Sequence, residues 1–216
     1  MKNQSGFTLI ELAIVLVIIG LLLGGVLKGQ ELINSAKVKN MASDFKNVQV
    51  YIYGYQDKYK ALPGDDIAAV SHLGTGIAPG NGNGLIGGNW DSVTTTDESF
   101  LFWQHVRLAG LAPGPTTFTD VAAYTPKNAD GGRVGIQSIS GTANLPTSPA
   151  RMNGAYVVCS GGILGKFAKQ LDTTLDDGAT ETGSMRVYAS AGAAWLPTTG
   201  AGAIDDSTPY NVCMSF

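Results

Sequence analysis

The sequence is poor in the residues on which most enzymes and nucleic-acid-binding proteins depend. Charged residues occupy 14% of the 216 positions, against about 25% in an average protein. The formal net charge of -3 argues against a nucleic-acid partner, because such proteins present a basic surplus. Two histidines, His72 and His105, and two cysteines do not form a zinc-site pattern. P-loop, G-x-S-x-G and helix-opening G-x-G-x-x-G motifs are also absent, so the common enzyme templates find no support.

The N-terminal part of the chain lacks proline and contains a long apolar run. No proline interrupts residues 7–61, so no helix there is broken in that way. Residues 7–27 are apolar apart from Thr8 and Glu11. At about 1.5 Å per residue, a helix over this segment spans roughly 30 Å, enough to cross the apolar core of a bilayer.

Three interpretations of residues 7–27 compete. A cleaved secretory signal has an apolar run of about 7–15 residues and then a small-x-small cleavage site. This run is longer, carries a carboxylate and is not followed by such a site. A plain transmembrane anchor fits the length but leaves Glu11 unexplained, because a lone carboxylate in a bilayer costs about 2.5–3.5 kcal/mol. The third interpretation gives Glu11 a partner.

Residues 6–12, GFTLIEL, with the apolar stretch that follows, resemble the class III signal of type IV prepilins. The resemblance implies that a prepilin peptidase cleaves between Gly6 and Phe7, and that Phe7 is then N-methylated. It also implies that Glu11 pairs with the N-terminal ammonium of a neighbouring subunit during filament assembly. In hydrocarbon each charge is costly alone, and pairing relieves both. The simpler alternative is that Glu11 only complements the helix dipole.

The helical pattern continues beyond the membrane-length segment. Apolar residues recur every three or four positions, the period of one helix face, at Val38, Met41, Phe45, Val48, Ile52 and Tyr55. The pattern predicts one helix over residues 7–58, about 78 Å long, apolar all round in 7–27 and amphipathic in 28–58. The alternative is two helices broken near the glycines between positions 20 and 29.

The remaining residues, 59–216, form short periodic segments separated by turn residues, and residues 1–6 form the leader. We expect helices over 99–109 and 163–171, strands over 133–138, 155–160 and 184–189, and irregular chain over 71–96 and 190–211. His105 is expected to be a packing residue. With the resemblance, the pattern indicates an α+β protein of the type IV pilin lollipop kind, in which a long N-terminal helix packs on a small antiparallel sheet.

The two cysteines, Cys159 and Cys213, permit one disulfide. Domains outside the cytoplasm form such bridges readily, and the pilin resemblance implies a bridge that bounds a C-terminal region. The bridge would close a loop of about 54 residues and contribute roughly 4 kcal/mol by loop entropy. The alternative is a pair of buried free thiols.

One segment resembles the core of a calcium loop. Asn81 and Asn83 place oxygen ligands two positions apart before Gly84. Pro79 stands at the first ligand position and Trp90 at the twelfth, where a bidentate glutamate belongs. Asn81 and Asn83 are therefore the metal candidates and calcium is the candidate cofactor, while Asp65, Asp91 or the pair Asp176 and Asp177 could supply charge only through tertiary contact. A glycine-asparagine turn is the alternative.

We therefore expect a structural subunit, a major or minor pilin, of a type IV pilus-like filament. Its partners would be prepilin peptidase, the inner-membrane assembly machinery and other pilin subunits. The precursor would cross the inner membrane once and end in a periplasm-spanning or surface filament. The first alternative is a pseudopilin of a type II secretion system. The second is a membrane-tethered exported enzyme or binding module, for which the sequence offers no catalytic constellation.

Overall fold

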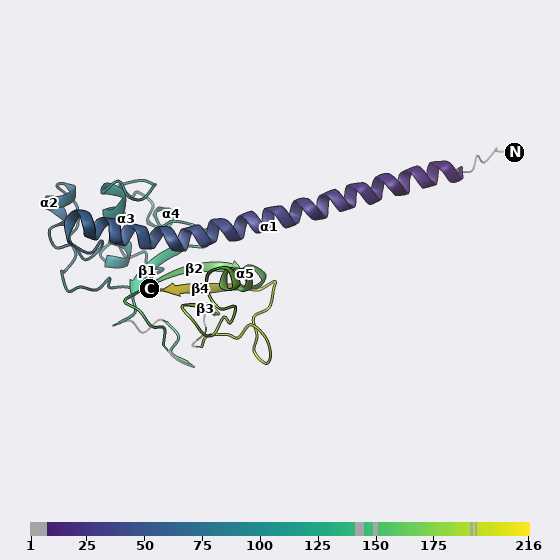
Figure 1. Ribbon diagram of the computed structural model, residues 1–216. Helices are drawn as coiled ribbons and strands as arrows, with labels where there is room; N and C mark the ends of the chain where they lie inside the picture. Colours follow the sequence, from purple (N-terminus) through teal and green to yellow (C-terminus); the bar gives the residue numbers. More distant parts are fainter. Residues whose placement is uncertain (1–7, 141–144, 149–150, 191, 193) are drawn as a thin grey trace. The chain divides into compact units, whose positions relative to one another are not determined.

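The computed structural model describes residues 8–140, 145–148, 151–190, 192 and 194–216 (Figure 1). The chain divides into two compact units, Met1–Lys37 and Val38–Phe216. One helix, α1 (Leu9–Tyr59, 51 residues), belongs to both units. The expected single long helix is therefore confirmed, and it continues without a break through the glycines. The predicted cleavage and methylation site at Gly6 and Phe7 lies outside the described residues.

The unit Val38–Phe216 is called the head. The second half of α1 contributes one face to its core. Its buried side chains are those of the predicted apolar stripe together with one alanine: Val38, Met41, Ala42, Phe45, Val48, Ile52 and Tyr55. The helix ends where Lys60 adopts a left-handed conformation, with φ 55°. The Lys60 N–H still donates to the carbonyl of Gln56 at 2.9 Å, which is the usual way a last helical carbonyl is satisfied. Pro63 then prevents the helix from continuing.

The head contains a four-stranded antiparallel sheet, as the α+β prediction requires (Figure 1). In spatial order the strands are β1 (Val134–Ser138), β2 (Tyr156–Leu164), β4 (Pro209–Ser215) and β3 (Met185–Tyr188). All three neighbouring pairs run antiparallel. The C-terminal strand β4 therefore lies inside the sheet, and only β1 and β3 are edges.

Successive side chains along the strands enter two different cores, because they point to opposite faces of a sheet. Val158, Val212 and Met214 belong to the main core, which includes the buried face of α1. The second core consists of Trp90, Met152, Val157, Cys159, Tyr188, Trp195 and Cys213. Cys159 and Cys213 face each other on β2 and β4 and are joined by a disulfide. The bridge thus ties the two central strands on the face opposite α1.

Four shorter helices complete the head: α2 (Ala69–Leu73), α3 (Glu98–Leu108), α4 (Val121–Tyr124) and α5 (Gly165–Leu175). Three expectations were wrong. The first concerns residues 71–73, which were predicted to be irregular and belong to α2. The other two concern the sheet. Residues 209–211, predicted to be irregular, begin β4, and Ile163 and Leu164, predicted to be helical, end β2. Both corrections have one cause: Ile163 pairs with Tyr210 and Leu164 with Pro209, a non-local pairing that outweighs local propensity.

We predict that replacing both cysteines by alanine destabilises the head by roughly 4 kcal/mol, because the unfolded chain is released from a loop of about 54 residues. The thermal midpoint of the intact chain in detergent should fall by about 10 °C. Wild-type protein under reducing conditions should show a similar fall. An unchanged midpoint in both samples would contradict the stabilising role of the bridge.

Candidate assembly site

The first half of α1 is an uninterrupted apolar surface. Its large hydrophobic side chains from Leu9 to Leu27 are all exposed, and Leu9 itself is 88% exposed. In the described part of the chain one helix, α1, is long and apolar enough to cross a membrane, and its apolar segment is not buried at all. Such a surface requires lipid or other apolar helices around it.

Glycines interrupt this surface with small gaps. Gly20, Gly24, Gly25 and Gly29 are helical, and a Cβ atom built on any of them meets no other atom within 4 Å. Their pairs have the spacing of small residues at which two membrane helices approach closely. The helix therefore offers backbone-to-backbone contact positions along a surface that is otherwise leucine, isoleucine and valine.

The only acidic side chain of the apolar half, Glu11, caps the start of its own helix. Its Oε2 accepts hydrogen bonds from the backbone N–H of Thr8 at 2.8 Å and from the Thr8 hydroxyl at 2.7 Å. In return the N–H of Glu11 donates to the Thr8 hydroxyl at 3.3 Å. This reciprocal arrangement is a capping box. A threonine three positions before a glutamate is the sequence signature of this motif, so Thr8 and Glu11 could have been expected to form it from their spacing alone.

The capping box leaves part of the Glu11 carboxylate available. Both of its hydrogen bonds go to Oε2, so Oε1 is the oxygen left for a group outside the described residues. A capping box accepts glutamine as well as glutamate at this position. The helix start therefore requires an acceptor at position 11, whereas it does not require the negative charge.

The other predicted site residues lie in the head. Asn81 and Asn83 belong to a loop held by two buried carboxylates: Asp65 accepts hydrogen bonds from the N–H groups of residues 82–84, and Glu98 accepts two more. The side-chain oxygens of Asn81 and Asn83 accept hydrogen bonds from N–H groups two positions ahead. All these oxygens already have donors, so the geometry accounts for an ordered loop, and calcium at Asn81 and Asn83 stays a prediction.

The two histidines take part in hydrogen bonds of the core. His105 is fully buried, its Nδ1 accepts from the N–H of Gly64 at 3.0 Å, and its Nε2 lies 2.9 Å from the carbonyl of Ala78. Burial lowers the pKa of His105, so the ring stays neutral. His72 lies 2.7 Å from the carboxylate of Asp66. The expected packing role of His105 agrees with this geometry.

A cavity of about 240 Å³ opens beside the second half of α1. Its lining includes Asp44, Tyr51, Trp103 and Lys127. The indole N–H of Trp103 is buried and has no hydrogen-bond partner in the described residues. Asp44 is half-buried, and burial raises its pKa from 3.8 to about 6. Ionised Asp44 therefore destabilises the head.

We predict that Asp44 makes the head less stable as the pH rises through about 6. The pKa of Asp44 is higher in the folded chain than in the unfolded chain, so the folded state gains stability at a pH below the unfolded-state pKa. This gain is lost once the pH exceeds the folded-state pKa. Asp44→Asn should narrow the difference between the thermal midpoints at pH 4 and pH 7. Asp57→Asn, which removes an exposed carboxylate from the same helix, is the control. Identical pH profiles for wild type and Asp44→Asn would rule out this role.

Comparison with known families identifies the same segment. The prokaryotic N-terminal methylation motif matches residues 1–27, which include Thr8, Glu11 and the apolar half of α1. No curated protein matches the chain. The matched motif implies processing by prepilin peptidase and assembly into filaments, and it points to a structural subunit and not to an enzyme. Residues 1–27 therefore carry the class III signal of type IV prepilins, and this signal supports a type IV pilin-like prepilin or pseudopilin.

Proposed function

We propose that this chain is a structural subunit, a major or minor pilin, of a type IV pilus-like filament. The observation that carries the proposal is the exposed apolar half of α1 combined with the methylation motif over residues 1–27. In this proposal the precursor crosses the inner membrane once, is cleaved between Gly6 and Phe7 and then leaves the bilayer for a filament core. The globular part of the head, residues 59–216, would form the filament surface.

Leaving the membrane requires interactions that lipid does not supply. Lipid tails are as apolar as leucine, so exchanging lipid for neighbouring helices gains little hydrophobic free energy. Close helix packing and charge pairing must therefore favour the filament. The open glycine positions of α1 support the first of these, and Glu11 supports the second.

The charge pair would join the Glu11 carboxylate to the Phe7 ammonium of a neighbouring subunit. N-methylation leaves this amine positively charged, so the attraction persists after modification. An isolated charge in hydrocarbon costs about 2.5–3.5 kcal/mol, which an ion pair offsets. The capping box already holds Glu11 at the start of α1, and thus reduces the conformational entropy that pairing would otherwise cost.

Glu11→Gln separates charge from capping, because glutamine can still close the capping box. We predict that this variant inserts in the membrane and is processed normally, while filament assembly falls at least about tenfold. Glu31→Gln is a matched control: it removes an exposed carboxylate from the same helix, where the carboxylate pairs with Lys28 at 2.7 Å. Filaments would be sheared from cells, imaged by electron microscopy and quantified.

Two results would count against this account, the first against the charge pair of Glu11 and the second against the proposed function itself. One is normal filament assembly by Glu11→Gln, which would leave capping as the only role of Glu11. The other is a mature chain that retains Met1 in cells with active prepilin peptidase, as seen by mass spectrometry of the N-terminus. If this chain is processed but never occurs in sheared surface filaments, the pseudopilin alternative replaces the pilus subunit.

A further inference from the structure

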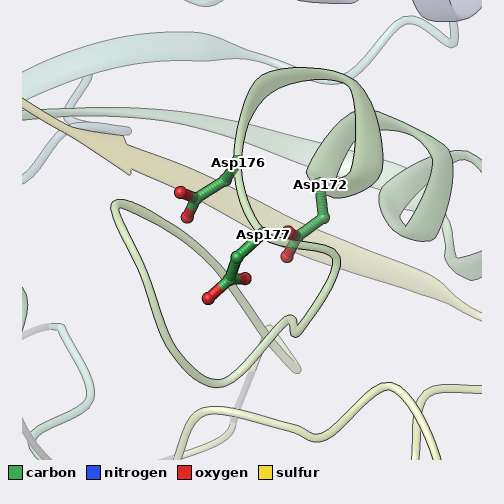
Figure 2. Close-up of side chains that lie close together, drawn as sticks. All are labelled: Asp172, Asp176 and Asp177. Atoms are coloured by element: carbon green, nitrogen blue, oxygen red, sulfur yellow. The ribbon is translucent and has the colours of Figure 1, made fainter.

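Three carboxylates gather where helix α5 ends. Asp172 lies in the last turn of α5, and Asp176 and Asp177 follow the helix directly (Figure 2). One oxygen from each of them lies within 4.8 Å of the others. In the described part of the chain, none of the ion pairs includes any of these three residues. None of the three carboxylates therefore forms an ion pair with a described residue.

Asp172 provides a second observation, independent of the clustering. Its side chain is completely buried. Its Oδ1 accepts a hydrogen bond from the N–H of Gly178 at 2.8 Å, whereas its buried Oδ2 has no partner among the described residues. Leaving such an oxygen unsatisfied costs about 1–3 kcal/mol, and more when the group is charged. One oxygen of this buried carboxylate thus lacks a hydrogen-bond donor within the described residues.

A further carboxylate adds to the negative charge at this place. Glu181 also has a buried oxygen, Oε2, without a hydrogen-bond partner in the residues described. Burial, opposed by the hydrogen bond from Gly178 and assisted by the charges of Asp177, Asp176 and Glu181, raises the pKa of Asp172 to about 6. The positive charge of Arg186 helps to lower the pKa of Asp177. The Nε of Arg186 donates to the carbonyl of Gly183 at 3.2 Å.

The helix itself makes this concentration of acids more costly. Carbonyl groups give the C-terminal end of a helix a partial negative charge, which favours cations there and disfavours carboxylates. Helix α1 follows this rule, with Lys58 in its last turn. Helix α5 has no basic residue in its last turn, and acids occupy the place instead. A bound cation would reverse this unfavourable electrostatics.

The segment after α5 wraps closely around the carboxylates. Gly178 and Gly183 both have positive φ, 83° and 68°, which glycine adopts without strain. A Cβ atom on Gly183 would lie 1.9 Å from Oδ2 of Asp176. The same Asp176 oxygen accepts a hydrogen bond from the N–H of Met185 at 2.8 Å. The backbone thus holds the carboxylates close together at the cost of their mutual repulsion.

We propose that Asp172, Asp176 and Asp177 bind a calcium ion, with Glu181 available as a further oxygen donor. The donor set consists of oxygens alone, which selects hard cations over zinc or copper. Calcium-oxygen distances of 2.3–2.6 Å allow two ligands on one ion to lie up to about 5 Å apart, whereas magnesium allows about 4 Å. The oxygens of the cluster all lie within 4.8 Å of one another, so a single calcium ion can reach them.

The test measures thermal unfolding and calcium affinity of the full chain in detergent, and does not depend on filament assembly. At a calcium concentration about 100 times the dissociation constant, the wild-type midpoint should rise by about 5 °C or more relative to EDTA. Magnesium at the same concentration should produce a smaller rise. Titration calorimetry with calcium chloride gives the affinity directly.

Two variants and one control make the test specific. Asp172→Asn keeps an acceptor for Gly178 but removes the buried charge, so it should be more stable than wild type in EDTA and lose the response to calcium. Asp177→Asn changes an exposed residue and should weaken calcium binding at least tenfold. Asp91→Asn removes an exposed carboxylate elsewhere and should bind as wild type does. A wild-type midpoint that is equal in calcium and EDTA, or unaltered affinity in both site variants, overturns the proposal.

Discussion

A carboxylate in an apolar helix is the constraint on which the N-terminal part of this protein depends. Glu11 stands among exposed leucine, isoleucine and valine side chains, where an unpaired charge is costly. In the single chain the Thr8 backbone and hydroxyl satisfy one of its oxygens. Glu11 thus caps the start of the helix and also carries a negative charge. In the proposed filament this charge would pair with the N-terminal ammonium of a neighbouring subunit.

The stability of the head depends instead on apolar packing, because both faces of its sheet are covered. The face toward α1 is filled by the apolar stripe of that helix, and the other by the tryptophans and the disulfide. Placing the C-terminal strand β4 in the middle of the sheet gives its backbone partners on both sides. The end of the chain is therefore held by two strands and by Cys213.

The head contains two clusters of carboxylates, and they differ in the donors that surround them. Asp65 and Glu98 accept hydrogen bonds from backbone N–H groups of the loop over residues 81–87, and these donors offset part of the cost of burying the carboxylates. Asp172 receives a single N–H and lies beside other carboxylates. The first arrangement orders a loop, whereas the second is the one for which we propose a bound cation.

The sequence by itself determined the long helix, the methylation signal and the α+β class, because these depend on local patterns: an apolar run, a stripe with helical period and short strands between turn residues. It also contained the capping box of Thr8 and Glu11. Only the tertiary structure decided that β4 is a central strand and that Ile163 and Leu164 end β2, since these follow from pairing between distant segments. The approach of Cys159 to Cys213 was open in the sequence for the same reason. The unsatisfied oxygen of Asp172 was also beyond the sequence, because burial and missing donors are properties of packing and not of residue order.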